Sequence, residues 1–232
     1  MPVVLLTPVG LDAACWDLCD PPSGAERHEW PGHGQRPLAD TPPDMASLAD
    51  EVAVTYDGTL DVIGVSLGGM VAQRLAIRHP DRVRSVFAAC TTGKGDPDTM
   101  AERAHSARED MPGAIASALT RWFTAEFLAE QPDHPAITYS RRTLEALDPE
   151  AYAQAWEAIA THDALAELPT VRARFTCLAG RQDVSSPPEQ AEAIASAVPG
   201  ARLVVLNGPH MLFLEDGPAF GAELRDHLAR VG

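Results

Sequence analysis

Residues 64–70 read GVSLGGM, in which Ser66 stands between small residues directly after the apolar run Leu60–Val65. The run has the composition of a buried β-strand, and the pattern that follows it is helical. At such a turn, Gly-x-Ser-x-Gly lifts the serine above the edge of a sheet. Gly64 and Gly68 let neighbouring backbone close around a residue in an unfavourable conformation. Because this pattern also occurs by chance, the rest of the chain must decide between a nucleophile and a plain turn residue.

The composition is that of an ordinary globular chain. Hydrophobic residues make up 45% of the 232 residues and charged residues 22%, which excludes a disordered or low-complexity protein. No apolar run approaches the ~20 residues of a membrane helix, and the start, MPVVLLTPVG, lacks the features of a secretory signal. We therefore expect a single cytoplasmic domain that does not bind membranes.

The charge balance excludes one large class of partners. Thirty-three acidic residues against eighteen Lys and Arg leave a formal charge of −15, which repels phosphate backbones. We expect no nucleic-acid partner, no metal and no cofactor. The cysteines have neither disulfide-framework nor zinc-ligand spacing, and we expect them to be reduced structural thiols: Cys15, Cys19, Cys90 and Cys177.

Strand-like and helix-like segments alternate along most of the chain. The strand-like runs are apolar throughout, which is typical of strands covered on both faces. This alternation predicts an α/β fold with a parallel sheet. The predicted strands are Val3–Leu6, Leu60–Val65, Val83–Ala89, Phe175–Ala179 and Arg202–Leu206, with a further strand near Ala25–Trp30; the predicted helices are Leu67–Arg78, Pro188–Val198 and Ala219–Arg230.

One region breaks the alternation. Residues 96–163 contain no convincing strand, only Ala-, Glu- and Arg-rich helical stretches interrupted by prolines. A segment of this length is too long for a simple crossover between strands. We interpret it as a helical cap inserted into an α/β core made of residues 1–95 and 164–232.

Two residues downstream of Ser66 complete a candidate triad. A serine hydroxyl needs a base within hydrogen-bonding reach and a group that orients the base. Asp183 follows the predicted strand Phe175–Ala179, and His210 follows the predicted strand Arg202–Leu206. This order of serine, acid and histidine is the order expected for a nucleophile on such a turn. We therefore predict that the three side chains meet at one edge of the sheet.

Each partner has a competing interpretation. His210 could instead cap the following helix, and Asp183 could be a turn residue. His33, in Gly-His-Gly after the strand near Ala25–Trp30, is the rival base, and Asp163 is the rival acid.

An oxyanion hole needs two backbone N–H groups near the reacting carbonyl, each worth about 3 kcal/mol. The amide of Leu67, directly after Ser66, is the first candidate. The second should lie in the loop Thr7-Pro8-Val9-Gly10, and because Pro8 has no N–H we assign it to Val9.

With these residues in place, the chain resembles the α/β-hydrolase family, and within it the 3-oxoadipate enol-lactonases. The resemblance spans nearly the whole length. It rests on LLTPVGLDAACWD, PGHGQRP, GVSLGGMVAQRLAIRHPDRVRSV, ACTTGKGDPDTMAER, RWFTAEF, AYAQAWEAIATHD, AGRQDVSSPPEQ and GPHMLFLED.

The resemblance implies an α/β-hydrolase fold and hydrolysis of a small-molecule ester or lactone through an acyl-enzyme on Ser66. It also places Trp122, in RWFTAEF, close to the substrate, although a tryptophan here could equally belong to the cap core. Two alternatives use the same fold: a C–C bond hydrolase or perhydrolase with the same triad, and a ligand-binding protein with little turnover.

Overall fold

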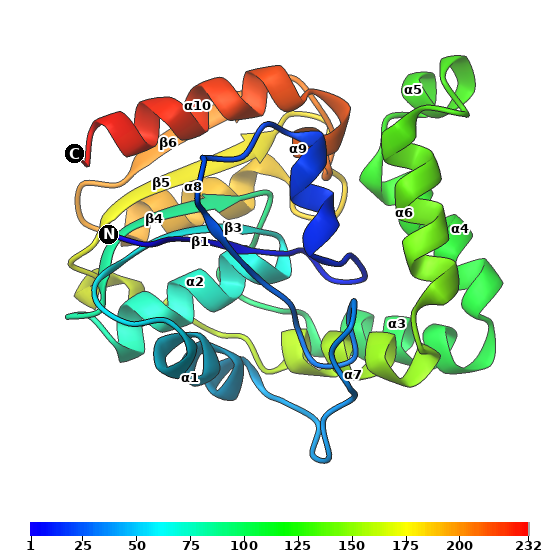
Figure 1. Cartoon of the computed structure of the whole chain (residues 1–232), viewed down its shortest axis with the longest axis horizontal. Coiled ribbons are helices and arrows are strands. Elements are labelled where there is room, and N and C mark those ends of the chain that lie inside the picture. Colours follow the sequence, from blue (N-terminus) through cyan, green and yellow to red (C-terminus); the bar gives the residue numbers. More distant parts are fainter. Residues whose placement is uncertain (232) are drawn as a thin grey trace.

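The computed structural model describes residues 1–231. Its centre is a six-stranded sheet with the order β2-β1-β3-β4-β5-β6, in which every neighbouring pair is parallel. The predicted α/β fold with a parallel sheet is confirmed (Figure 1). The strands are β1 (Val3–Leu6), β2 (Glu26–His28), β3 (Leu60–Val65), β4 (Val83–Ala89), β5 (Arg174–Gly180) and β6 (Arg202–Leu206).

The strand β6 differs from the others in its burial. All six residues of β3 are buried, whereas Leu203 in β6 is 37% exposed and its neighbours are partly exposed. The expectation that β6 is covered on both faces is wrong, because β6 lies at the edge of the sheet and has only one neighbouring strand.

Helices cover both faces of the sheet. Figure 1 shows α1 (Met45–Thr55) and α2 (Leu67–Arg78) on one side and α10 (Gly217–Ala229) on the other. The helix α8 (Pro188–Ala197) packs against β5 and β6. The predicted bounds of α2 match, and α10 begins two residues before the predicted start because the side chain of Asp216 caps it by accepting the N–H of Ala219.

Five helices occupy the chain between β4 and β5. Four of them begin with a proline in the first turn, where a missing N–H costs nothing. Most of the prolines in this region therefore mark helix starts, whereas Pro132 lies in a turn between two of the helices. Figure 1 shows α4, α5 and α6 at one end of the sheet, to the right. The helices are α3 (Pro97–Glu109), α4 (Met111–Trp122), α5 (Ala125–Glu130), α6 (Pro135–Ala146) and α7 (Pro149–Ala160).

The two ends of this helical segment lie side by side. Lys94 and Asp163 form an antiparallel β-bridge, and their side chains form an ion pair of 2.7 Å. The N–H of Gly95 donates to the carbonyl of His162 at 2.8 Å. These contacts close the base of the segment at the two positions where the sequence indicates its boundaries.

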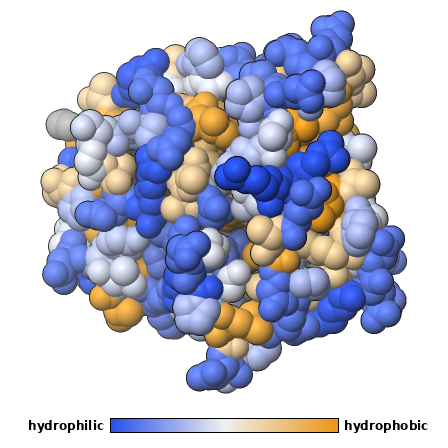
Figure 2. Space-filling view, turned by 45° about the vertical axis from the view of Figure 1, so that its right-hand side comes forward, coloured by the Kyte–Doolittle hydropathy of each residue, from blue (hydrophilic) through white to orange (hydrophobic). Residues whose placement is uncertain are grey.

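One face of the molecule is predominantly polar. Figure 2 shows a face on which hydrophilic residues prevail and hydrophobic ones are scattered between them. Within residues 1–231, no helix combines the length and apolar character needed to cross a membrane. The four cysteines are all free and buried, and burial raises the pKa of the Cys177 thiol to about 12.

Candidate active site

Ser66 occupies a strained turn between β3 and α2. Its φ of 54° and ψ of −115° lie in a region that residues with a side chain rarely adopt. The two flanking glycines are required by space: a Cβ at Gly64 would lie 2.2 Å from the carbonyl oxygen of Gly68, and a Cβ at Gly68 would lie 2.2 Å from that of Leu6. The turn therefore depends on backbone-to-backbone contacts that only glycine permits.

The structure brings Ser66, His210 and Asp183 together. His210 follows β6 and Asp183 follows β5, so the parallel sheet delivers both to the edge that carries Ser66. The ring atom Nε2 of His210 lies 3.0 Å from Ser66 Oγ, and Nδ1 lies 2.8 Å from Asp183 Oδ2. Because a carboxylate only accepts, Nδ1 carries the proton, and Nε2 is free to accept the hydroxyl proton of Ser66. All three residues are at least 95% buried.

Asp183 is itself held in place by the backbone. Its second oxygen, Oδ1, accepts the N–H groups of Ser185 and Ser186, each at 2.8 Å. These bonds fix the carboxylate so that Oδ2 points at the imidazole. Asp183 is therefore more than the turn residue that its Gly-, Ser- and Pro-rich surroundings also allow.

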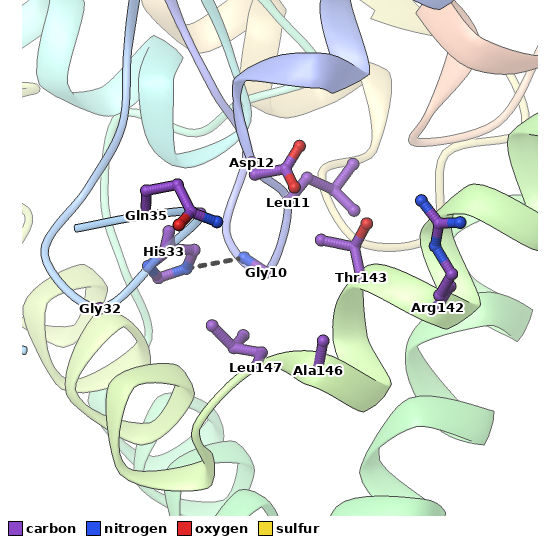
Figure 3. A pocket seen from close by; sticks show the side chains of 11 residues that line it. Gly10, Leu11, Asp12, Gly32, His33, Gln35, Arg142, Thr143, Ala146 and Leu147 are labelled. Atoms are coloured by element: carbon purple, nitrogen blue, oxygen red, sulfur yellow. Dashed lines mark hydrogen bonds between the residues drawn. The ribbon is translucent and has the colours of Figure 1, made fainter. Parts of the chain in front are cut away.

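The loop after β1 contains Val9, whose amide is assigned to the oxyanion hole. The N–H of Gly10 donates to Nε2 of His33 at 3.1 Å, as Figure 3 shows, and is therefore occupied. Among the described residues, the N–H of Val9 has no acceptor. Leu67 is the first residue of α2, so its N–H has no partner inside the helix. The two amides assigned to the oxyanion hole are thus both available.

His33, the rival base, has a different task that the sequence did not indicate. Its Nδ1 lies 3.0 Å from the carbonyl of Pro31, so Nδ1 donates there and Nε2 accepts from Gly10. Burial lowers the pKa of His33, which favours this neutral form. His33 therefore holds the loop of Val9 in position. The sequence marked His33 as a candidate through Gly-His-Gly, but it could not show that its hydrogen-bond partner is Gly10, 23 residues earlier in the chain.

The rival acid Asp163 lies elsewhere. It pairs with Lys94 at the base of the helical segment, whereas Asp183 is the carboxylate that contacts His210.

Three side chains of the helical segment cover the loop after β1. A Cβ at Gly10 would lie 2.8 Å from Leu144, 3.1 Å from Tyr152 and 3.4 Å from Trp122. Trp122 is 1% exposed, and its carbonyl accepts the N–H of Met211, next to His210, at 2.9 Å. Leu144 and Tyr152 were missed in the sequence, although Tyr152 lies in the quoted stretch AYAQAWEAIATHD.

A cavity of about 380 Å³ lies beside this loop (Figure 3). The loops after β1 and β2 form one wall, with Leu11 and His33, and α6 forms the other, with Arg142 and Thr143. None of the three triad side chains lines it. Among residues 1–231, no group of three or more His, Cys, Asp or Glu side chains is arranged to hold a metal ion.

Known proteins of similar sequence indicate the family of this chain. Residues 3–223 match the alpha/beta hydrolase family. A pimeloyl-[acyl-carrier protein] methyl ester esterase from Neisseria meningitidis serogroup B is 34% identical over 84% of this chain and 79% of its own length. A 3-oxoadipate enol-lactonase from Acinetobacter baylyi is 29% identical over 76% of this chain and 65% of its own length.

A solved structure of similar shape is the enol-lactonase from Burkholderia xenovorans. It has a TM-score of 0.92 and 29% identity, with coverage of 98% of this chain and 91% of the other. The family resemblance noted in the sequence, including the likeness to enol-lactonases, is confirmed. The chain belongs to the alpha/beta hydrolase family of enzymes.

Proposed function

We propose that this chain is a serine hydrolase that cleaves a small carboxylic ester or lactone through an acyl-enzyme. The observation that carries the proposal is the continuous chain of hydrogen bonds from Ser66 Oγ through the His210 ring to Asp183. Such a chain activates an otherwise weak alcohol nucleophile. The names of relatives, an esterase and an enol-lactonase, support the same reaction class.

The proposed first half-reaction forms the acyl-enzyme. Nε2 of His210 takes the hydroxyl proton while Ser66 Oγ bonds to the carbonyl carbon. The N–H groups of Val9 and Leu67 stabilise the negative charge on the carbonyl oxygen, by about 3 kcal/mol each. The bond to the leaving oxygen then breaks, and His210 passes its proton to that oxygen, which leaves as an alcohol or, in a lactone, stays on the acyl chain as its enol or hydroxyl.

In the second half-reaction, His210 takes a proton from water, and the water oxygen bonds to the acyl carbon. The bond between this carbon and Ser66 Oγ breaks, and His210 returns the proton to the serine. Asp183 stays ionised and stabilises the imidazolium in both halves. We further propose that residues 96–163 act as a cap and that Trp122 contacts the substrate, because its ring packs over Gly10 in the loop that holds Val9.

The test uses a short-chain p-nitrophenyl ester and a fluorophosphonate probe. We expect wild-type protein to turn over the ester and to be labelled at Ser66, and the Ser66→Ala variant to lose labelling and at least about 10³-fold in rate. Ser196→Ala, at an exposed serine on α8, is the matched control and should behave as wild type. A wild-type protein that is neither labelled nor active would favour the ligand-binding alternative.

Substrate class is the second question for assay. The two named relatives act, by their names, on a methyl ester and on an enol-lactone. Comparing kcat/KM for a simple methyl ester and for an enol-lactone separates these two classes. Assays for C–C bond cleavage and for peroxyacid formation cover the alternatives that use the same three side chains.

A further inference from the structure

Two arginines of the helical segment line the same cavity, and neither of them has a carboxylate partner in the described part of the chain. Arg103 on α3 and Arg121 on α4 face a cavity of about 230 Å³, whose remaining wall is formed by Tyr152 and Trp156 on α7. Within residues 1–231, neither arginine takes part in an ion pair. What distinguishes these two arginines is that both line the same cavity.

A nearby arginine on the same helix shows the ordinary arrangement. Arg108 on α3 pairs with Glu150 at 2.7 Å and with Glu157 at 2.6 Å, both on α7. Arg103 also faces α7, but its guanidinium carbon lies 4.7 Å from the centre of the Trp156 ring. The aromatic face stabilises the cation without neutralising it.

Two of the residues that line the cavity carry a buried polar atom without a hydrogen-bond partner. The Nε of Arg121 and the phenol oxygen of Tyr152 are buried without a hydrogen bond, and Tyr152 is only 1% exposed. One terminal nitrogen of Arg121 donates to the hydroxyl of Ser117. A buried donor without an acceptor costs about 1–3 kcal/mol, so these groups favour a ligand that accepts hydrogen bonds.

The two positive charges also act on each other. Burial, and after it the neighbouring charge of Arg121, lower the pKa of Arg103 to about 10. Burial lowers the pKa of Arg121 as well. Two guanidinium groups held together in a partly desolvated space are stabilised by an anion between them.

The other lining residues are compatible with an anion. Hydroxyl groups come from Thr99, Ser106 and Ser117, which can donate hydrogen bonds. Glu102 is the single acidic residue among the lining side chains of the described chain, and it is exposed. A carboxylate or phosphate group with its oxygens toward α4 and α7 would meet donors on several sides.

The geometry points to an anion-binding site: we propose that the cavity between α3, α4 and α7 binds a carboxylate or phosphate group through Arg103 and Arg121. The site lies behind Tyr152, whose ring also packs over Gly10 in the loop of the proposed oxyanion hole. A bound anion would accept a hydrogen bond from the phenol of Tyr152. It would thereby fix the ring that packs against Gly10. The anion is either part of the ester substrate or a separate small molecule, and the two sources are distinguishable.

The binding test uses the Ser66→Ala protein, so that it does not depend on turnover. Titration with inorganic phosphate and with glutarate, followed by calorimetry, should show binding of at least one of the two anions. Arg103→Gln and Arg121→Gln should each weaken it at least tenfold, and Tyr152→Phe, a milder change, should weaken it less. Arg172→Gln, at a residue whose side chain is 77% exposed, controls for the loss of one positive charge.

The source of the anion is tested with otherwise wild-type protein. A dicarboxylic acid monomethyl ester and a neutral methyl ester of equal length are compared in wild type and in Arg121→Gln. If the anion belongs to the substrate, KM rises at least tenfold for the charged ester only. If it is a separate molecule, both KM values change equally while anion binding is lost. Absence of anion binding in Ser66→Ala, or equal binding in the arginine variants with native circular dichroism, would overturn the site without touching the proposed hydrolysis.

Discussion

At the scale of single residues, Asp183 has two separate tasks for its two carboxylate oxygens. One accepts two backbone N–H groups and fixes the side chain, and the other accepts the N–H of His210. The position of the imidazole, and hence the distance of Nε2 from Ser66 Oγ, depends on both. A side chain with the shape of aspartate but with different hydrogen-bond donors and acceptors should therefore separate the packing role of Asp183 from its role in orienting His210.

Asp183→Asn is expected to lower kcat by about 10³- to 10⁴-fold, because an amide can present its NH₂ to His210 and select the wrong tautomer. Steady-state ester hydrolysis measures the effect. Thermal unfolding should change little, since the shape is conserved. A loss of less than tenfold would contradict the assigned role of Asp183.

Gly68→Ala is expected to destabilise the protein strongly. The new Cβ would lie 2.2 Å from the carbonyl oxygen of Leu6, a backbone atom that cannot move without shifting β1. We expect a loss of about 3 kcal/mol or more in the free energy of unfolding, measured in urea. Gly58→Ala is the comparison variant, because Gly58 has a positive φ, +77°, but nothing lies within 4 Å of its Cβ, whereas Gly68 has no positive φ and lacks only space. A loss in Gly68→Ala no larger than that in Gly58→Ala would contradict the requirement for space at Gly68.

At the scale of elements, the helical segment contacts the core at its base and at its far end. Its base is closed by Lys94 and Asp163, and its far end contacts the region just after His210. There the carboxylate of Glu215, at the end of α9 (Leu212–Glu215), accepts both the N–H and the hydroxyl of Thr124, at 2.9 and 2.7 Å. The start of α5 is thus attached to the element that follows the candidate base.

Glu215→Ala is expected to lower the free energy of unfolding by about 1–3 kcal/mol, because the partly buried N–H of Thr124 loses its acceptor. Urea unfolding measures the loss, and limited proteolysis should find faster cleavage near α5. The comparison variant is Glu223→Ala, which removes a partly exposed ion pair with Arg202 and should cost less than about 1 kcal/mol. Equal costs would contradict an anchoring role for Glu215.

At the scale of the whole molecule, stability should depend on pH through two buried histidines. Burial lowers the pKa of His162 to about 4 and that of His227 to about 4. An unfolded histidine titrates near 6.5, so below this pH the unfolded chain binds more protons than the folded one. The contribution of each neutral histidine to the free energy of unfolding is therefore fully present above about pH 6.5, and it is lost as the pH falls toward 4.

Between pH 7 and pH 5, each of these histidines should remove roughly 2 kcal/mol from the free energy of unfolding. In His162→Asn this pH dependence should be weaker than in wild type by that amount, as measured by urea unfolding at the two pH values. His105→Asn, at an exposed histidine of α3, should keep the wild-type dependence. An unchanged dependence in His162→Asn would show that this imidazole does not stay neutral in the folded chain.

Local sequence patterns located the strands of this fold, the helices α2, α8 and α10, and the order of the residues in its candidate site, but not the helix α1. Apolar runs between prolines or glycines are sufficient to locate strands, because burial on both faces removes polar residues from them. The strand ends then place Ser66, Asp183 and His210 at one edge, since parallel strands have their carboxyl ends together. The bounds of α2 and the position of the helical segment follow from the same local signals.

Only the tertiary structure decided the contacts between distant segments. It showed β6 as an edge strand, His33 as the acceptor for Gly10, and Tyr152 and Leu144 above the same loop. It also placed Arg103 and Arg121 around one cavity without an acidic partner. Local periodicity carries no information about which helix face meets which loop. Those contacts are selected by packing and by the pairing of buried polar groups, which arise only when the whole chain is folded.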